Sequence, residues 1–234
     1  MDSQISHSNI RFSLVRRAVQ YISTYIKQNR LSLGDSLPSE AQLAEDLEVS
    51  KTVVREAFGA LAALGVLDVS NGRRARVGAF ENAAFSASLN HGVVTDQVSL
   101  SEVWEVRIAM EIKIAELAAV NRSDAQSFAI SKHAEAMRDF VHDLAIVVQH
   151  DVAFHEAIAT ASGNALFRQI ICSFSPLMRE VVKGAWETRK TESQRHRMVE
   201  RHLRVAQAIE DRNPENAAEF MAEHFESSIG KQLF

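Results

Sequence analysis

The stretch LSLGDSLPSEAQLAEDLEVSKTVVREAFGALAALGVLDVSNGRRARV, residues 31–77, decides the fold of the N-terminal part of the chain. Its apolar spacing predicts two short helices, over 40–47 and about 51–64, and each is preceded by a serine that can cap the first turn. Asn71-Gly72 is the strongest two-residue signal for a hairpin between two extended pieces. The inner face of the second helix is predicted to carry Val54, Ala57 or Phe58, Leu61 and Leu64.

A longer helix is predicted upstream of this stretch, over about residues 12–29. Apolar residues recur there at steps of four, three and four and form one stripe: Val15, Val19, Ile22 and Ile26. The complete order is then helix, helix, tight turn, helix and a hairpin whose extended pieces lie at 66–69 and 74–77. That order predicts a winged helix-turn-helix.

The composition limits the class of protein. Of 234 residues, 46% are hydrophobic and 24% charged, which excludes wholesale disorder. No apolar run approaches the ~18 residues that a membrane-spanning helix needs, and the first residues carry no apolar signal-peptide stretch. Cys172 is the only cysteine, which excludes a disulfide framework and a cysteine-based zinc cluster. A reducing cytoplasm is the expected location.

The net charge of −4 hides a difference between the two parts of the chain. Residues 1–78 carry a net charge of +2, whereas residues 79–234 carry a net charge of −6. Phosphate recognition depends on local positive charge rather than on the average over the chain. The acidic total therefore does not exclude a nucleic-acid-binding domain at the N-terminus.

Basic residues gather where a winged helix contacts DNA. The first turn of the helix over 51–64 exposes Lys51, Thr52 and Arg55, and this turn of a recognition helix reaches base edges in the major groove. An arginine there can pair bidentately with a guanine edge. The hairpin tip beside Gly72 suits the DNA backbone or minor groove because it carries Arg73, Arg74 and Arg76. The alternative is a solvated face on a protein-interaction module.

Residues 31–77 resemble the DNA-binding domain of the GntR superfamily of bacterial transcription regulators. The matching residues are Gly34, Leu37-Pro38-Ser39-Glu40, Leu43-Ala44, Val49-Ser50, Val54-Arg55-Glu56-Ala57, Leu61, Gly65 and Val77. The resemblance implies operator contacts for the recognition-helix residues Lys51, Thr52 and Arg55, and for Asn71 and Gly72 in the wing. Ala41 departs from the family, in which many members have an arginine that also touches DNA.

The rest of the chain is predicted to be helical. Residues 79–98 are small and polar and are predicted to be a linker between a DNA-binding domain over 1–78 and a helical domain over 99–234. The fold class is therefore mainly α, with an all-helical bundle of about six or seven helices after the winged helix. Pro176 is a predicted kink. The predicted helices begin near 99, 123, 144, 165, 192 and 214, and the last runs to about 228.

Four polar residues lie within apolar helical faces of this domain. Asp151 and His155 are one helical turn apart, whereas His202 and His224 lie on two later helices. A buried polar group costs free energy unless it has a partner. Three imidazoles and a carboxylate that converged could satisfy one another through a divalent metal. For each histidine alone, a hydrogen-bonded core residue is the alternative.

Three pieces of this domain resemble the FCD effector-binding domain of the FadR-type branch of the same superfamily. They are VWEVRIAMEIKIAELAA, HDVAFHEAIATASGN and ERHLRVAQAIEDRNPENAAEFMAEHF. In metal-binding members an aspartate and three histidines hold the ion, which implies Asp151, His155, His202 and His224 here. Zinc is the first expectation, with nickel, cobalt and manganese as alternatives. The remaining histidines of interest match no motif and are predicted to be surface or structural: His133, His142, His150 and His196.

Two further residues are candidates for effector contact. Arg107 lies one turn before Glu111, so a simple ion pair is one interpretation. The resemblance instead implies that Arg107 faces the cavity and holds a carboxylate ligand. Asn164 is the second candidate, although Gly-Asn also suits a helix end. The implied effector is a small organic acid or sugar acid.

Together these features predict a transcription regulator, a repressor, that binds a pseudo-palindromic double-stranded operator as a homodimer and responds to a carboxylate metabolite. The rival is a metal-dependent enzyme with an appended winged helix, because such a metal site can leave a position for water. The chain has no Gly-rich phosphate loop and no His-Glu-x-x-His signature, which argues against an enzyme. An interaction module that does not bind DNA is a third alternative.

Overall fold

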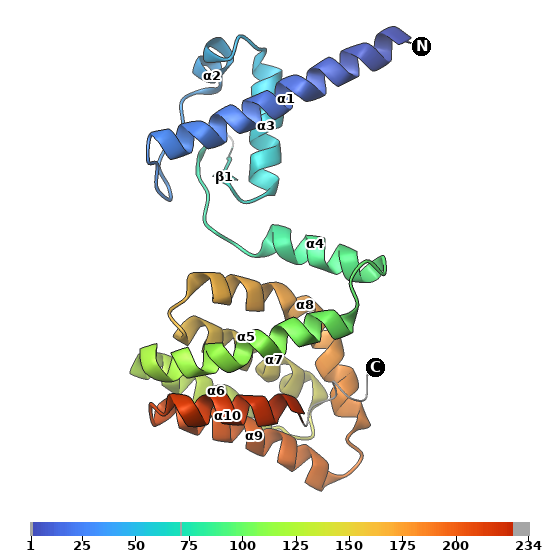
Figure 1. Ribbon diagram of the computed structural model, residues 1–234, viewed down its shortest axis with the longest axis vertical. Helices are drawn as coiled ribbons and strands as arrows, with labels where there is room; N and C mark the ends of the chain where they lie inside the picture. Colours follow the sequence, from blue (N-terminus) through green and yellow to red (C-terminus); the bar gives the residue numbers. More distant parts are fainter. Residues whose placement is uncertain (1, 71, 227–234) are drawn as a thin grey trace. The chain divides into compact units, whose positions relative to one another are not determined.

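The computed structural model describes residues 2–70 and 72–226, with side chains described from residue 11 onward. The chain divides into two compact units between Ala84 and Phe85, a point inside the predicted linker. We refer to them as the N-terminal and C-terminal units. Figure 1 shows the elements of both units and labels most of them.

The N-terminal unit has the order of elements that the sequence predicts. Its helices are α1 (Asp2–Gln28), α2 (Glu40–Asp46) and α3 (Lys51–Ala63), followed by strands β1 (Leu67–Asp68) and β2 (Arg76–Val77). The two strands are antiparallel, with Leu67 opposite Val77. Helix α1 begins about ten residues before its predicted start. A helix can continue beyond its packed apolar stripe because its backbone hydrogen bonds are made within the helix.

Local capping explains where the short helices begin and end. The Ser39 side chain accepts a hydrogen bond from the Gln42 amide, and the Ser50 side chain accepts one from Val53. Each serine thereby satisfies an amide that has no partner within its helix. Gly65 follows α3 with a φ of 73°, as a left-handed cap requires.

The core of the N-terminal unit lies between α1, α2 and α3. Ile22, Leu43 and Val54 are fully buried, and Ala57, Phe58 and Leu61 pack in the same core. The prediction that Leu64 faces this core was wrong, because its exposed fraction is 62%. Leu64 is the C-cap residue directly after the end of α3 at Ala63, so it lies at the margin of the buried face.

The C-terminal unit is an all-helical bundle. The predicted linker contains helix α4 (Ala83–Val94), and the six helices that follow agree closely with the predicted ranges. They are α5 (Leu100–Asn121), α6 (Asp124–Asp139), α7 (Leu144–Ala161), α8 (Ala165–Thr188), α9 (Glu192–Glu210) and α10 (Pro214–Glu226). Helix α8 runs on through Pro176. The predicted end of the last helix near residue 228 lies outside the described residues.

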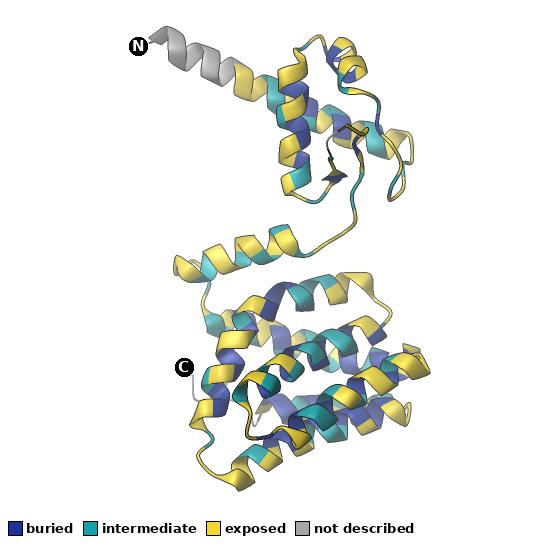
Figure 2. Cartoon of the chain, turned by 180° about the vertical axis from the view of Figure 1, so that it is seen from behind, coloured by how far each residue is buried: buried dark blue, intermediate teal, exposed yellow. Residues whose placement is uncertain are grey.

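Helix α7 packs against α5, α6 and α8, while α10 packs against α5 and α9. Buried residues line the inward faces of these helices, as Figure 2 shows in dark blue. Phe154 and Ile158 of α7 and Ile209 of α9 are fully buried. None of the described helices is both long and apolar enough to cross a membrane.

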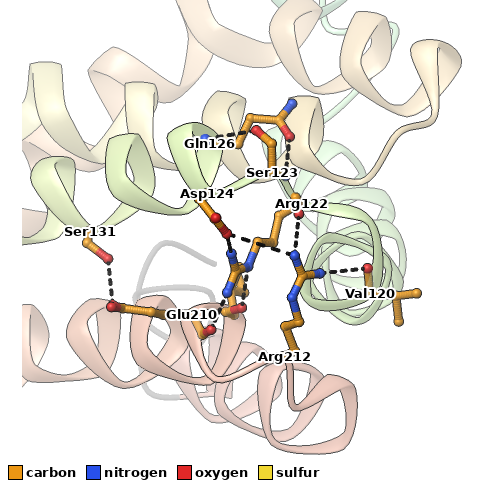
Figure 3. Close-up of polar contacts among 9 residues, drawn as sticks. Val120, Arg122, Ser123, Asp124, Gln126, Ser131, Glu210 and Arg212 are labelled. Carbon is orange, nitrogen blue, oxygen red and sulfur yellow. Dashed lines mark hydrogen bonds and ion pairs between the residues drawn. The ribbon is translucent and has the colours of Figure 1, made fainter.

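Two arginines close the ends of helices at one side of the bundle (Figure 3). Arg122, which follows α5, donates to the backbone carbonyls of Ile209 and Glu210 at the end of α9. Arg212 donates to the carbonyls of Val120 and Arg122, each over 3.1 Å. The last carbonyls of a helix have no partner within the helix and carry partial negative charge. The two guanidinium groups therefore satisfy both helix ends and hold them together.

Candidate metal centre and nucleic-acid interface

Three of the predicted metal ligands meet inside the C-terminal unit. His155 of α7, His202 of α9 and His224 of α10 are buried, and one ligand atom from each lies within 4.8 Å of the others. The closest ring centroids are those of His202 and His224, which are 4.4 Å apart. The packing of three helices therefore brings together residues that are up to 69 positions apart in the sequence.

Asp151 joins this histidine cluster from the same face of α7 as His155. Its Oδ1 atom lies 3.0 Å from Nε2 of His202. Burial by itself would raise the pKa of Asp151, but hydrogen bonding and positive charge at His202, with help from His155 and Arg107, lower it to about 2. Asp151 is therefore a carboxylate at neutral pH and can offer oxygen to a cation.

Hydrogen bonds orient two of the three imidazoles. Nδ1 of His202 donates to the backbone carbonyl of Met198 over 2.9 Å, which leaves Nε2 facing Asp151. Nδ1 of His155 donates to the carboxylate of Glu111, which leaves its Nε2 available. Metal-ligating histidines commonly use one ring nitrogen in this way and bind the ion with the other.

Glu111 is the residue that the sequence interpretation missed as part of the cluster. It is 1% exposed and contacts both His155 and Arg107. Burial would raise the pKa of Glu111, but the charges of Arg107 and His155 lower it overall. The available signal was a glutamate on the apolar face of α5, one turn after an arginine on the same face.

Arg107 is buried beside the cluster. It pairs with Glu111, as the spacing on α5 predicts. Its guanidinium also lies over the rings of Trp104 and Phe225, at 5.4 and 5.5 Å from their centroids. Phe225 in turn packs against His224 with 5.2 Å between ring centroids. Arg107 is therefore linked to the histidine cluster through Phe225 and Glu111.

Burial is the main reason that the pKa of His224 is low and that its imidazole is neutral. Burial lowers the pKa of His224 well below its usual value, and the positive charges of His202, His155 and Arg107 lower it further. A neutral imidazole has a lone pair with which to bind a metal.

The interaction of Arg189 with Asp151 of the cluster was not anticipated from the sequence. Burial lowers the pKa of Arg189 and nearby Arg201 lowers it further, whereas Asp151 opposes the shift.

The donor set fits a divalent metal. Neutral imidazoles and a carboxylate are the ligands that zinc, nickel, cobalt and manganese take from proteins. The two hydrogen bonds from Nδ1 atoms orient His155 and His202 as metal ligands are usually oriented. Phe154 contacts both of these rings edge-on and helps to keep water away from the site.

The other predicted residues of this unit lie elsewhere. Asn164 is exposed, and its side-chain oxygen accepts hydrogen bonds from Leu166 and Phe167, so it caps α8 rather than reaching the histidines. Nδ1 of His133 lies 2.9 Å from Nδ1 of His150 at a half-buried position. His142 and His196 are exposed.

The predicted DNA-contacting residues of the N-terminal unit are exposed where the structure describes them. Lys51, Thr52 and Arg55 extend from the first turns of α3 while Val53 and Val54 are buried beneath them. Gly72 has a φ of 76°, which a hairpin turn requires and glycine adopts without strain. Asn71 lies outside the described residues.

A hollow of about 590 Å³ brings most of these residues together. It is lined from α3 by Lys51 and Arg55 and from the wing by Gly72, Arg73 and Arg74. Arg76 has a different role, because it donates to the carbonyl of Gly34 over 3.0 Å.

Glu40 of α2 lines the same hollow, and its role was not anticipated. Nε of Arg55 donates to Oε2 of Glu40 over 2.7 Å. The sequence spacing of fifteen residues gives no periodic signal for this contact. It depends on how the turn places α2 against α3.

A winged helix with exposed cationic side chains is followed in this chain by a helical bundle with a buried cluster of possible metal-binding side chains. This combination defines a class of DNA-binding transcription regulators. Residues 14–77 match the family described as bacterial regulatory proteins, gntR family, and residues 102–227 match the FCD domain. The chain belongs to the GntR family of regulators, in the branch that carries an FCD domain.

Individual relatives agree with this assignment. The chain is 32% identical to the HTH-type transcriptional regulator LutR of Bacillus subtilis, over 85% of this chain and 92% of LutR. It is 27% identical to the HTH-type transcriptional repressor NanR of Klebsiella aerogenes, over 93% and 84% of the two chains. A solved structure titled Streptococcus agalactiae GntR has a TM-score of 0.65 and 27% identity, covering 91% of this chain and 97% of that one.

These findings confirm the predicted fold class, family and regulatory role. The protein is a transcription regulator, and the alternative of a metal-dependent enzyme is not supported, because the relatives are named as regulators.

Proposed function

We propose that this protein is a repressor whose operator binding is controlled by a small carboxylate metabolite, bound beside a divalent metal in the C-terminal unit. The observation that carries the proposal is the buried cluster of His155, His202, His224 and Asp151 next to Arg107. Buried ionisable groups without a structural need are costly, and they gather where a ligand binds.

Asp151, His155, His202 and His224 would hold the metal. Zinc is the first choice because it accepts three nitrogen ligands and one oxygen, and nickel, cobalt or manganese could occupy the same donor set. When bound, the ion supplies a positive charge that a carboxylate can coordinate.

Arg107 would bind the carboxylate of the effector. Nε of Arg107 is used by Glu111, but Nη1 donates to the thioether of Met178 over 3.0 Å. A thioether is a weak acceptor, so a carboxylate is a better partner for the terminal nitrogens. The exposed capping position of Asn164 gives no support for an effector contact.

In the N-terminal unit, α3 would enter the major groove with Lys51, Thr52 and Arg55, and the wing would contact the backbone through Asn71, Gly72, Arg73 and Arg74. A homodimer would present two such helices to a pseudo-palindromic operator, and effector binding would change operator affinity through allosteric coupling. A regulator of this kind acts where bacterial DNA lies, in the cytoplasm.

The DNA-binding part is tested with Arg55→Ala. This side chain is exposed, so we expect the variant to fold normally and to lose specific operator binding in a gel shift with a duplex selected from a random-sequence pool. Lys113→Ala, which removes the same charge from an exposed position on α5, is the control. Unchanged affinity of Arg55→Ala for the selected duplex would refute this assignment.

The metal site is tested by elemental analysis of protein purified without chelator. We expect a 1:1 ratio of metal to chain in the wild type and a sharp reduction in His202→Ala. His196→Ala is the matched control, since His196 is an exposed histidine on the same helix α9. A wild-type protein without metal, or equal losses in both variants, would count against the site.

The effector class is tested by a thermal-shift screen of small organic acids and sugar acids on the metal-loaded protein. A ligand stabilises the state that it binds by an amount that grows with the logarithm of the ratio of its concentration to its Kd. We expect stabilisation by a carboxylate in the wild type and its loss in Arg107→Met, which keeps much of the apolar volume. Stabilisation that is the same in the variant would exclude Arg107 as the binding residue.

A further inference from the structure

Glu40 presents a negative charge in a hollow that otherwise suits the DNA backbone. The hollow is lined by four cationic side chains, those of Lys51, Arg55, Arg73 and Arg74. A carboxylate there repels phosphate groups and weakens sequence-independent binding. A residue that lowers general affinity at this place must have another use if the hollow faces DNA.

The contact between Glu40 and Arg55 leaves part of the arginine available. Among the described residues, Arg55 donates its side-chain hydrogen bond from Nε to Glu40. The two terminal nitrogens, Nη1 and Nη2, therefore remain for another partner. They form the pair of donors that a guanine edge accepts through O6 and N7.

We propose that Glu40 is a positioning residue that holds Arg55 through Nε and turns its terminal nitrogens toward a guanine, so that Glu40 sets operator specificity without contacting a base. This inference rests on the proposed DNA-binding role of Arg55. An unrestrained arginine side chain is long and flexible, and it binds a phosphate as readily as a base edge. The pair with Glu40 removes part of that freedom before DNA arrives, and the negative charge disfavours the phosphate alternative.

The location of Glu40 supports a fixed geometry. It is the first residue of α2, directly after the capping residue Ser39, whose side chain accepts from the Gln42 amide. The start of a helix favours a carboxylate through the helix dipole. A purely local role at the helix start is the alternative, and it predicts effects on folding but none on base preference.

The test uses the full-length protein and a duplex obtained by selection from a random-sequence pool. The guanine that Arg55 contacts is identified first. It is the operator position at which a base substitution weakens DNA binding by the wild type but not by Arg55→Ala. We then expect the wild type to prefer guanine there by about tenfold or more. We expect Glu40→Ala to lose most of this preference while its affinity for unrelated DNA rises.

Two further variants separate positioning from charge. Glu40→Gln can still accept a hydrogen bond and should keep an intermediate preference. Glu40→Asp keeps the charge but is one methylene shorter, so it should lose preference nearly as far as Glu40→Ala. Glu45→Ala removes the same charge from an exposed position on α2 and should behave as the wild type.

Full guanine preference in Glu40→Ala, or an equal loss in Glu45→Ala, would overturn the proposal. Wild-type preference in Glu40→Asp would also overturn it, because charge alone would then suffice. If Arg55→Ala itself keeps every base preference, the proposed DNA contact fails instead. The two failures are therefore distinguishable in one set of binding measurements.

Discussion

Each unit of this protein contains an arginine–glutamate pair, and the two pairs differ in their access to water. The side chains of Arg55 and Glu40 in the N-terminal unit are 66% and 35% exposed. Those of Arg107 and Glu111 in the C-terminal unit are 3% and 1% exposed. In these two pairs the same chemistry therefore occurs at a surface and inside a core.

The difference determines what each pair can do. An exposed ion pair is worth little to stability, about 0–1 kcal/mol, because water and salt screen it. The paired Arg55 therefore stays accessible to DNA. A buried pair must keep its partners, because an uncompensated charge in the core is costly. Arg107 and Glu111 can hold His155 in a defined orientation, and they suit a small ligand that reaches the core.

The two pairs should differ most when the glutamate of each is removed. We expect Glu111→Ala to lower the free energy of unfolding of the C-terminal unit by about 3–5 kcal/mol, because it leaves Arg107 buried without its partner. We expect Glu40→Ala to cost the N-terminal unit at most about 1 kcal/mol. Urea unfolding of the C-terminal unit is followed by tryptophan fluorescence, since Trp104 and Trp186 are the only tryptophans in the chain.

Glu116→Ala is the control for Glu111→Ala. Glu116 is on the same helix α5, and it pairs with Lys113 over 2.6 Å with both side chains well exposed. We expect a cost below about 1 kcal/mol for this variant. Similar costs for Glu111→Ala and Glu116→Ala would show that burial does not distinguish the pairs.

The elements of both units could be predicted because their signals are local. Ser39, Ser50 and Ser123 each precede a helix and cap it, as the sequence indicates. The apolar stripe from Val15 to Ile26 packs on the N-terminal core as expected. The early start of α1 was missed because no apolar repeat marks it. Helix α4 has no buried residue among those described, so its pattern was weak.

The histidine cluster could be predicted only through family resemblance, and its supporting residues could not. Asp151 and His155 share a helical face, which the spacing shows. The contact between Glu111 and His155 joins residues 44 positions apart on two helices, and no periodicity reports it. The contact between Glu40 and Arg55 also joins two helices, and no periodicity reports it either. Residues that orient others are therefore the part of a site that sequence reasoning loses first.

Removing the metal should affect the stability of the two units differently, because only one of them contains the proposed ligands. We expect chelation to lower the stability of the C-terminal unit by ~2.7 kcal/mol if the metal was present at about 100 times its Kd. Tryptophan fluorescence during thermal unfolding measures this change. Hydrogen exchange at α3 in the N-terminal unit should not change at temperatures at which both units are folded.

His202→Ala should abolish the effect of chelation, and His196→Ala should preserve it. An equal response to chelator in His202→Ala and in the wild type would place the metal elsewhere in the chain. An effect on α3 as large as that on the C-terminal unit would show that the two units are not independent in stability.

A smaller effect is expected from the cap of the recognition helix. Ser50→Ala removes the acceptor for the Val53 amide at the start of α3, and the expected cost is about 1 kcal/mol. Because Lys51 and Thr52 lie in that first turn, DNA affinity should fall as well. Hydrogen exchange at the first amides of α3 and a gel shift measure the two effects.

Ser23→Ala is the control for the cap. Ser23 is an exposed residue within α1 whose hydroxyl donates to the carbonyl of Val19. Alanine is a good helix former, so we expect little change in stability. If Ser50→Ala frays α3 without weakening DNA binding, the first turn is not part of the interface.

The smallest expected effect separates the units by pH. In the metal-free protein, burial and neighbouring positive charge lower the pKa of His224 and, more modestly, that of His133. The unfolded chain therefore takes up protons near pH 6.5 that the folded chain does not bind. The stability conferred by the neutral histidines is complete above that pH and decreases as the pH falls below it.

The described side chains of the N-terminal unit include no histidine, so acidification from pH 7 should destabilise the C-terminal unit first. Thermal unfolding at stepped pH, with His133→Gln as a variant that removes one of the two groups, measures the shift. Parallel loss of stability in both units would show that carboxylates, and not the buried histidines, dominate the acid response.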